Sequence, residues 1–277
     1  MSRRTGSTLC PACGKLVGVN DEECFHCGRK RPGMWGLTPK LRALGGDLGF
    51  VNLVLVGCGV LYLLTLVASM AAGSLGGFFS PGNGVLARFG ASGALPVFGL
   101  GRWWTVLSAG WLHGGVLHIL FNLMWLRNLG PTTAAIYGPA RMVLIYIAGS
   151  IGGFGLSSLA GQYLHFLPAA LRGASLTVGA SAPIFGLLAA LIYYGRRGGS
   201  SIIGQQAKTW ALILLVFGLL MPRVDNWAHL GGFVGGWLGA RWLDPLRPER
   251  PDHILLAVVG LVATVASIVA SLVLPIG

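Results

Sequence analysis

The stretch Gly179-Ala-Ser-Ala-Pro-Ile-Phe-Gly186 predicts a helix that begins in the middle of an apolar segment. Pro183 lacks an amide hydrogen and is favoured in the first turn of a helix, and a serine such as Ser181 is a favoured N-cap. A helix of about 14 residues from Ser181 is roughly 21 Å long, which is shorter than a hydrocarbon core of about 30 Å. Residues 172–179 would then enter a membrane as irregular backbone, which requires burial in protein or contact with water. We therefore expect Ser181 at the floor of a cavity, although a serine that only packs against a neighbouring helix would also explain the small side chain.

The composition of the whole chain is that of a polytopic membrane protein. Of its 277 residues, 54% are hydrophobic and 10% are charged, and the mean hydropathy is +0.71. A soluble domain carries about 25% charged residues. The predicted fold class is therefore an all-α membrane protein with seven apolar spans, at roughly 50–72, 106–126, 140–161, 177–194, 209–221, 226–243 and 254–275.

The distribution of positive charge predicts the orientation of these spans. The net charge is +12, but nucleic-acid binding is not expected, because the Lys and Arg residues separate by side. With residues 1–49 in the cytoplasm, four arginines lie on the outer side: Arg88, Arg102, Arg172 and Arg223. The other 16 lie on the cytoplasmic side: Arg3, Arg4, Lys15, Arg29, Lys30, Arg31, Lys40, Arg42, Arg127, Arg141, Arg196, Arg197, Lys208, Arg241, Arg247 and Arg250. The positive-inside rule then places the N-terminus in the cytoplasm and the C-terminus outside, with some attraction to anionic lipid.

The N-terminal residues 1–30 contain two Cys-x2-Cys pairs, Cys10 with Cys13 and Cys24 with Cys27. Four thiolates complete a tetrahedral zinc site, and paired thiols in a reducing cytoplasm indicate a metal rather than a disulfide. A zinc ribbon with structural Zn²⁺ is therefore predicted; a redox-active cysteine pair is the alternative. Such a ribbon could recruit a cytoplasmic protein partner. Residues 31–49 are predicted to be a basic Gly/Pro-rich linker to the membrane.

Polar side chains recur inside the second span. His118 and Asn122 are four residues apart and share one helical face. An imidazole and an amide inside a bilayer require a polar cavity or a partner. A hydrogen bond between helices would satisfy them equally well, so the pair alone leaves both interpretations open.

The sixth span places His229 beside two rows of small residues. Gly231, Gly235 and Gly239 form one row, and Ala228, Gly232, Gly236 and Ala240 form the next. Small residues at every fourth position let helices approach closely, and the fourth span offers Gly186 with Ala189 or Ala190 as a partner surface. Ser181 and His229 both fall in the first part of their spans, so we expect them to meet.

No Asp or Glu lies between Asp47 and Asp225. Asp225 precedes His229 by one helical turn but lies at the membrane edge. A serine nucleophile needs a base within hydrogen-bond reach, and here packing rather than a carboxylate must hold the imidazole. The expectation is a Ser-His dyad, with no metal or cofactor in catalysis. An aspartyl protease is excluded by the missing carboxylates, and a zinc protease lacks a His-Glu-x-x-His motif.

Three motifs together resemble the rhomboid family of intramembrane serine proteases over residues 50–243. They are His118-x3-Asn122 on the second span, Gly179-x-Ser181 on the fourth, and Ala228-His229-x2-Gly232 on the sixth. The resemblance implies a six-helix core, with residues 244–277 adding a linker and a seventh transmembrane helix. It further implies Ser181 as nucleophile and His229 as general base and acid.

The resemblance also implies an oxyanion hole formed by His118, Asn122 and the backbone N–H of Ser181, with Gly179, Phe185 and Gly232 in supporting positions. Phe185 matches an aromatic residue that packs on the histidine. Two departures stand out: Ala182 replaces a frequent glycine, and the family's Trp-Arg pair becomes Trp104-Thr105, with Arg102 nearby.

The implied substrates are transmembrane segments of other proteins, which must unwind locally before cleavage. A catalytically inactive relative that binds or escorts membrane clients is the alternative; such relatives typically lack the serine or the histidine, and this chain has both. A transporter or channel would show inverted repeats and intramembrane charges, which the sequence lacks.

Overall fold

The computed structural model describes residues 6–10, 13–32, 46–77, 79–168, 172–221, 224–247 and 249–274. The chain forms two compact units, Met1–Gly49 and Phe50–Gly277. Most of the predicted linker, residues 33–45, lies outside the described residues.

The first unit is a small hairpin structure. Strands β1 (Ser7–Leu9) and β2 (Leu16–Gly18) pair antiparallel, with Ser7 opposite Gly18. The backbone N–H of Gly18 donates to the carboxylate of Asp21 at 2.6 Å, which closes the turn after β2.

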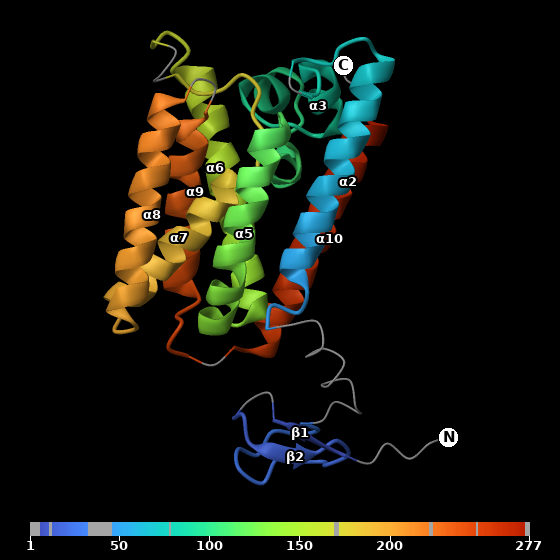
Figure 1. Ribbon diagram of the computed structural model, residues 1–277. Coiled ribbons are helices and arrows are strands. Elements are labelled where there is room, and N and C mark those ends of the chain that lie inside the picture. Colours follow the sequence, from blue (N-terminus) through green and yellow to red (C-terminus); the bar gives the residue numbers. More distant parts are fainter. Residues whose placement is uncertain are drawn as a thin grey trace. The chain divides into compact units, whose positions relative to one another are not determined.

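The second unit is a helical bundle (Figure 1). Its long helices are α2 (Phe50–Ala71), α5 (Val116–Tyr137), α6 (Pro139–Tyr163), α7 (Ser181–Arg196), α8 (Ser201–Leu220), α9 (Asn226–Trp242) and α10 (Pro251–Val273). Between α2 and α5 lie α3 (Asn83–Phe89), η2 (Leu95–Gly99), α4 (Thr105–Ser108) and η3 (Ala109–Trp111). The colours of Figure 1 show that α5, α7 and α9 run opposite to α2, α6, α8 and α10.

The predicted all-α membrane fold is confirmed. Among the described residues, α2, α6, α8 and α10 are long and apolar enough to cross a membrane, and α5 qualifies together with the bent segment before it. Helices α7 and α9 have only 16 and 17 residues. The short helix predicted from Pro183 is therefore present.

Two predicted spans had wrong boundaries. The second span does not run continuously from residue 106: Thr105–Trp111 meets α5 at 96°, and α5 begins at Val116 and continues to Tyr137. Hydropathy could not detect this break, because both pieces are apolar. The fifth helix begins at Ser201 rather than 209, because the hydroxyl of Ser200 accepts the N–H of Ile203 at 3.4 Å and caps it.

Helices α6, α7 and α9 form the centre of the bundle, and glycines bring their backbones together. A methyl group at Gly232 would collide with the carbonyl of Ala182, and one at Gly236 with Gly186, so this row packs on α7 as predicted. The other row faces a different neighbour: Gly231 abuts the carbonyl of Gly152 on α6. The tight contact between α9 and α7 fixes the distance between the starts of these two helices.

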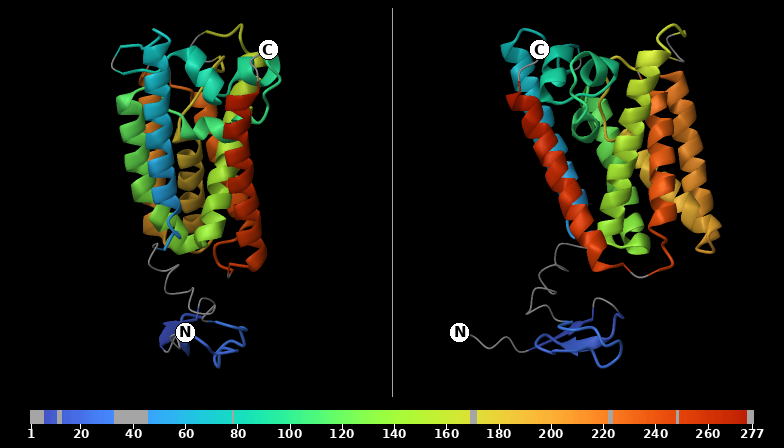
Figure 2. Two further views of the ribbon diagram at one scale, coloured as in Figure 1. Left: turned by 90° about the vertical axis from the view of Figure 1, so that its right-hand side faces the viewer. Right: turned by 180° about the vertical axis from the view of Figure 1, so that it is seen from behind.

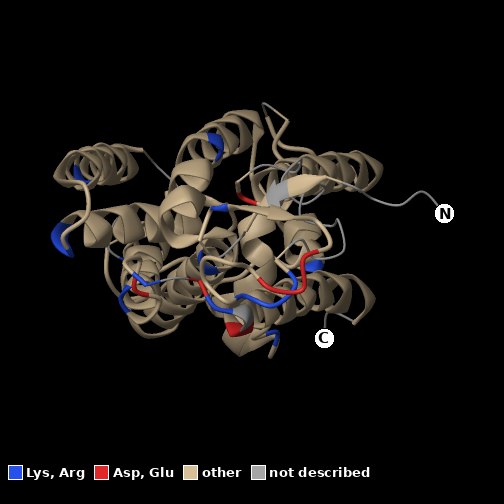
Figure 3. Cartoon of the chain, turned by 90° about the horizontal axis from the view of Figure 1, so that it is seen from below, with Lys and Arg blue, Asp and Glu red and all other residues tan. Residues whose placement is uncertain are grey.

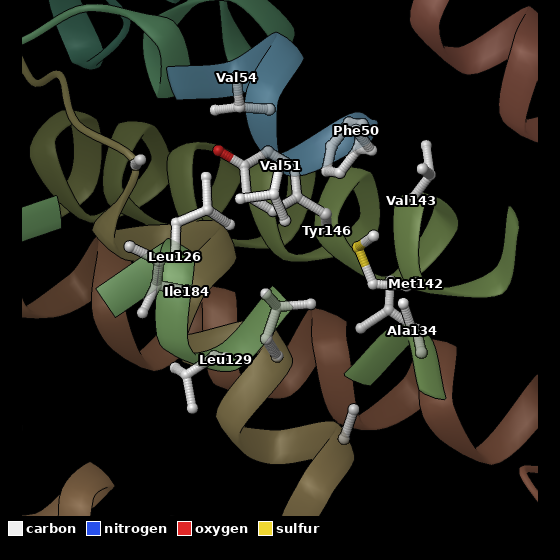
Figure 4. Close-up of a cluster of buried hydrophobic side chains, with 14 of the residues drawn as sticks. Phe50, Val51, Val54, Leu126, Leu129, Ala134, Met142, Val143, Tyr146 and Ile184 are labelled. Carbon is white, nitrogen blue, oxygen red and sulfur yellow. The ribbon is translucent and has the colours of Figure 1, made fainter. Parts of the chain in front are cut away.

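A cluster of buried side chains supports the start of α7 from the side (Figure 4). Phe50 and Val54 of α2 meet Leu126 of α5 and Tyr146 of α6, and Ile184 belongs to the same cluster. The rings of Phe50 and Tyr146 contact edge to face at 5.3 Å. Because lipid tails are as apolar as these side chains, close packing rather than the hydrophobic effect holds this part together.

Two buried arginines join α10 and its preceding loop to the bundle. Arg141 of α6 donates to the carbonyls of Leu243, Asp244 and Arg247 at 2.8–3.1 Å. Arg102 donates to the carbonyl of Ala87 at 2.8 Å and to that of Ser271 in α10. Figure 2 shows α10 and α8 at opposite sides of the bundle.

Charged residues are rare along the helices. Figure 3 shows Lys, Arg, Asp and Glu mainly in loops and near helix ends. This distribution is the one expected for helices that lie in lipid.

Candidate functional site

The backbone before α7 is irregular, as predicted, and protein satisfies its hydrogen bonds. Thr177 and Ser92 exchange two backbone bonds of 2.8 and 3.0 Å, and the N–H of Gly179 donates to the carbonyl of Ala109 at 3.0 Å. Residues 172–179 thereby pair with segments between α2 and α5 instead of facing lipid. Figure 1 shows the segment before α7 descending between the helices, so that α7 begins inside the bundle.

Ser181 is the first residue of α7 and not its N-cap. Ala180 occupies the N-cap and makes no side-chain capping bond. The hydroxyl of Ser181 is directed elsewhere: its Oγ lies 3.0 Å from Nε2 of His229. Ser181 is half-buried, whereas Ala182–Ile192 are buried. The helix start therefore presents a hydroxyl to an imidazole.

The imidazole of His229 is held by an aromatic ring. It stacks on Phe185 with ring centres 4.4 Å apart and planes at 19°. The carboxylate of Asp225 is otherwise engaged, because it accepts the N–H of Ala228 at 3.0 Å and the hydroxyl of Ser157. The imidazole of His229 is therefore in contact with the hydroxyl of Ser181 and is positioned by packing rather than by a carboxylate.

Asn226, the first residue of α9, was not among the predicted site residues. Its Nδ2 donates to the carbonyl of Gly218 in α8 at 3.1 Å. A methyl group at Gly218 would lie 2.6 Å from Oδ1 of Asn226 and 3.3 Å from Nδ1 of His229. Asn226 and Gly218 thus border the side of the imidazole that faces away from Ser181. An asparagine one turn before the histidine was the only available signal in the sequence.

His118 and Asn122 converge on a small space beside Gly179. A methyl group there would lie 2.5 Å from Nε2 of His118 and 3.6 Å from Nδ2 of Asn122. Nδ1 of His118 accepts the N–H of Gly114 at 3.3 Å, which assigns the proton of the neutral ring to Nε2. Nδ2 of Asn122 is buried and has no hydrogen-bond partner among the described residues. Two N–H donors therefore point into a space beside Gly179, two residues before Ser181. This space is open only because residue 179 has no side chain.

Trp104 and Thr105, which stand in place of the family's Trp-Arg pair, make structural contacts in this chain. Thr105 is buried and its hydroxyl donates to the carbonyl of Arg102 at 2.8 Å. The indole N–H of Trp104 donates to the hydroxyl of Ser271 at 3.1 Å. Trp104 therefore ties the segment before α5 to α10, whereas the hydroxyl of Thr105 bonds to residues that precede α5.

The four cysteines of the first unit lie together. The thiol sulfurs of Cys10, Cys13, Cys24 and Cys27 are all within 4.8 Å of one another, and no two of them form a disulfide. Cys10 to Cys27 and Cys13 to Cys24 are each 3.7 Å apart. A tetrahedron with Zn–S bonds of about 2.3 Å has sulfurs roughly 3.8 Å apart, so the cluster could hold such an ion. Gly14 and Gly28, at φ +71° and +68°, form the turn after each pair.

Comparison with known proteins identifies the family. The Rhomboid domain model matches residues 100–243, just over half of the chain. The chain belongs to the rhomboid family. This confirms the resemblance drawn from the three motifs, and the matched range contains all of them. The apolar helices and the family together make the protein a multi-pass integral membrane protein.

Several relatives are about one-third identical to this rhomboid over the residues that align. Rhomboid protease GluP of Bacillus subtilis is 34% identical over 166 residues, which cover 59% of this chain and 30% of GluP. RHOMBOID-like protein 2 of Arabidopsis thaliana is 34% identical over 57% of this chain and 48% of its own length. The putative rhomboid protease YdcA of Bacillus subtilis is 32% identical over 50% of this chain and 66% of its own. The chain thus spans less than half of the first two relatives.

Proposed function

We propose that this rhomboid protein is an intramembrane serine endopeptidase that uses Ser181 as nucleophile and His229 as general base and acid. The observation that carries the proposal is the 3.0 Å separation between Oγ of Ser181 and Nε2 of His229. This distance is within the range that a nucleophile and its base require. The stacked ring of Phe185 supports the imidazole in the role that a carboxylate has in a triad.

In the first step, Oγ of Ser181 attacks the scissile carbonyl carbon while its proton passes to Nε2 of His229. The carbonyl oxygen of the substrate becomes an oxyanion. Nε2–H of His118, Nδ2–H of Asn122 and the N–H of Ser181 would donate to it in the space beside Gly179. Preorganised donors of this kind contribute about 3–4 kcal/mol each to transition-state stabilisation.

Collapse of this intermediate breaks the C–N bond, and His229 delivers its proton to the leaving amine. The acyl group is then an ester of Ser181. His229 next accepts a proton from a water molecule that attacks this ester, and collapse returns the proton to Ser181 and releases the acid. No metal or cofactor enters these steps.

The proposed substrates are transmembrane segments of other membrane proteins. A helical amide is already hydrogen-bonded and shielded, so the segment must unwind before its carbonyl reaches Ser181. Small and helix-destabilising residues near the cleaved bond are the expected preference. The proposed orientation has the N-terminus in the cytoplasm and the site opening toward the outer side.

Covalent labelling tests the proposed nucleophile. A fluorophosphonate probe is expected to label the folded wild-type protein at Ser181, because the hydroxyl is half-exposed and paired with a base. Ser158→Ala is the matched control: Ser158 is a buried serine whose hydroxyl donates to Phe154 at 2.7 Å. Ser181→Ala should lose the label, and Ser158→Ala should keep it. An unlabelled but folded wild-type protein would favour the inactive, client-binding alternative.

We also propose that the four cysteines hold one structural Zn²⁺ and that this ribbon takes a cytoplasmic protein partner. The support is the matching sulfur separations and the absence of a disulfide among the described residues. A closed four-thiolate site leaves no open position for chemistry.

Metal analysis of single-cysteine variants tests the ribbon. Purified wild-type protein is expected to contain about one zinc per chain, and Cys24→Ser should remove most of it. Cys58→Ser is the control, because Cys58 is buried alone in α2. The idea fails if Cys24→Ser retains its zinc or if the wild-type protein carries a different metal.

A further inference from the structure

A groove of about 570 Å³ lies between α8 and α9, with α7 beneath it. Most of its lining is apolar, from Leu212 and Leu215 on α8 to Phe233 and Val234 on α9. Helix α8 packs mainly on α7, which leaves the groove between α8 and α9 open. Along α9 the groove extends from His229 to Leu238, or about 14 Å at 1.5 Å per residue. This length is roughly half of a 30 Å hydrocarbon core, the depth of one lipid leaflet.

The groove has two positive charges in its lining. Arg196 ends α7 and Lys208 lies on α8, and both are exposed. The guanidinium of Arg196 lies 5.3 Å from the ring centre of Trp237, which holds it over the groove. Within the described part of the chain, the ion pairs involve Arg197, Arg247 and Arg250, and neither Arg196 nor Lys208 has an acidic partner. The groove therefore has a mainly apolar lining and two positive charges without acidic partners.

We propose that this groove binds one anionic phospholipid, with an acyl chain along α8 and α9 and the phosphate between Arg196 and Lys208. An apolar groove as long as one leaflet is deep suits an acyl chain. A phosphodiester supplies the negatively charged partner that Arg196 and Lys208 do not have in the protein. A transmembrane peptide would fill the groove but leave the cations unpaired. The proposed orientation places these cations toward the cytoplasmic leaflet, where anionic lipids attract Lys and Arg.

Native mass spectrometry of the full chain in a zwitterionic detergent tests the site. Phosphatidylglycerol and phosphatidylcholine with identical acyl chains are titrated separately. Wild-type protein should bind one phosphatidylglycerol on the order of tenfold or more tightly than phosphatidylcholine, given two favourable cation contacts. The double variant Arg196→Gln/Lys208→Gln should lose that preference. Arg127→Gln/Arg241→Gln removes the same charge from two exposed arginines outside the groove and should keep it.

A second pair of variants tests the acyl chain. Leu215→Trp fills part of the groove and should weaken phosphatidylglycerol binding, although Arg196 and Lys208 remain. Leu219→Trp, at an exposed position of α8 outside the groove, should not. The proposal is overturned if the wild-type protein binds both lipids equally, if the Arg196/Lys208 variant keeps its preference, or if Leu215→Trp has no effect. It is also overturned if Leu215→Trp abolishes binding of a transmembrane peptide while phosphatidylglycerol still binds.

Discussion

Ser181→Ala and His229→Ala are each expected to lower cleavage of a transmembrane substrate by about 10⁴-fold or more, the range seen when a nucleophile or its base is removed. The reason is the 3.0 Å contact between the two side chains. Without His229 the serine hydroxyl has no base, and without Ser181 the imidazole has no nucleophile to activate. Initial rates for a reconstituted substrate in liposomes measure the effect.

The double variant gives the sharper result. Residues that act as one unit are strongly non-additive, so Ser181→Ala/His229→Ala should be no slower than either single variant. Ser158→Ala should retain near wild-type rates and serves as the control for removing a buried serine hydroxyl. Multiplicative losses in the double variant, or cleavage that persists in both single variants, would contradict the dyad. Thermal unfolding of each variant separates loss of chemistry from loss of fold.

The sequence predicted the helices better than their ends. Hydropathy finds apolar residues, and it cannot tell a continuous span from two apolar pieces that meet at 96° before Val116. Pro131 lies inside α5 without ending it. The opposite case is Pro183, where a proline in the first turn correctly indicated a short helix. Local backbone preferences were therefore informative at a helix start and not in a helix interior.

The residues of the site could be predicted from the sequence, but their arrangement depends on how the helices pack. The sequence predicted Ser181 both as a capping residue and as a neighbour of His229. Only the second role is present, because α9 lies against α7 at Gly232 and Gly236. The row formed by Gly231, Gly235 and Gly239 packs on α6, which no periodicity in one helix could reveal. Asn226 was missed because its partner, Gly218, lies on the preceding helix and has no side chain to mark a contact.

Gly179→Ala is expected to reduce cleavage by at least about 10²-fold, because its methyl group would occupy the space into which the proposed oxyanion donors point. The new carbon would lie 2.5 Å from Nε2 of His118. Gly179 also has φ +130°, which disfavours any other residue, so backbone strain needs its own control. Gly198→Ala supplies it: φ is +102° there and a methyl group would meet nothing within 4 Å.

Asn122→Ala removes one of these donors without filling the space. We expect a fall of about 10²–10³-fold in kcat with little change in KM, because the hydrogen bond forms only as the oxyanion develops. Fluorophosphonate labelling should slow in both Asn122→Ala and Gly179→Ala but not in Gly198→Ala, since phosphonylation also places negative charge on an oxygen beside Ser181. If Asn122→Ala raised KM alone, its amide would be a contact for substrate in the ground state. If Gly198→Ala matched Gly179→Ala, strain rather than the blocked space would explain the loss.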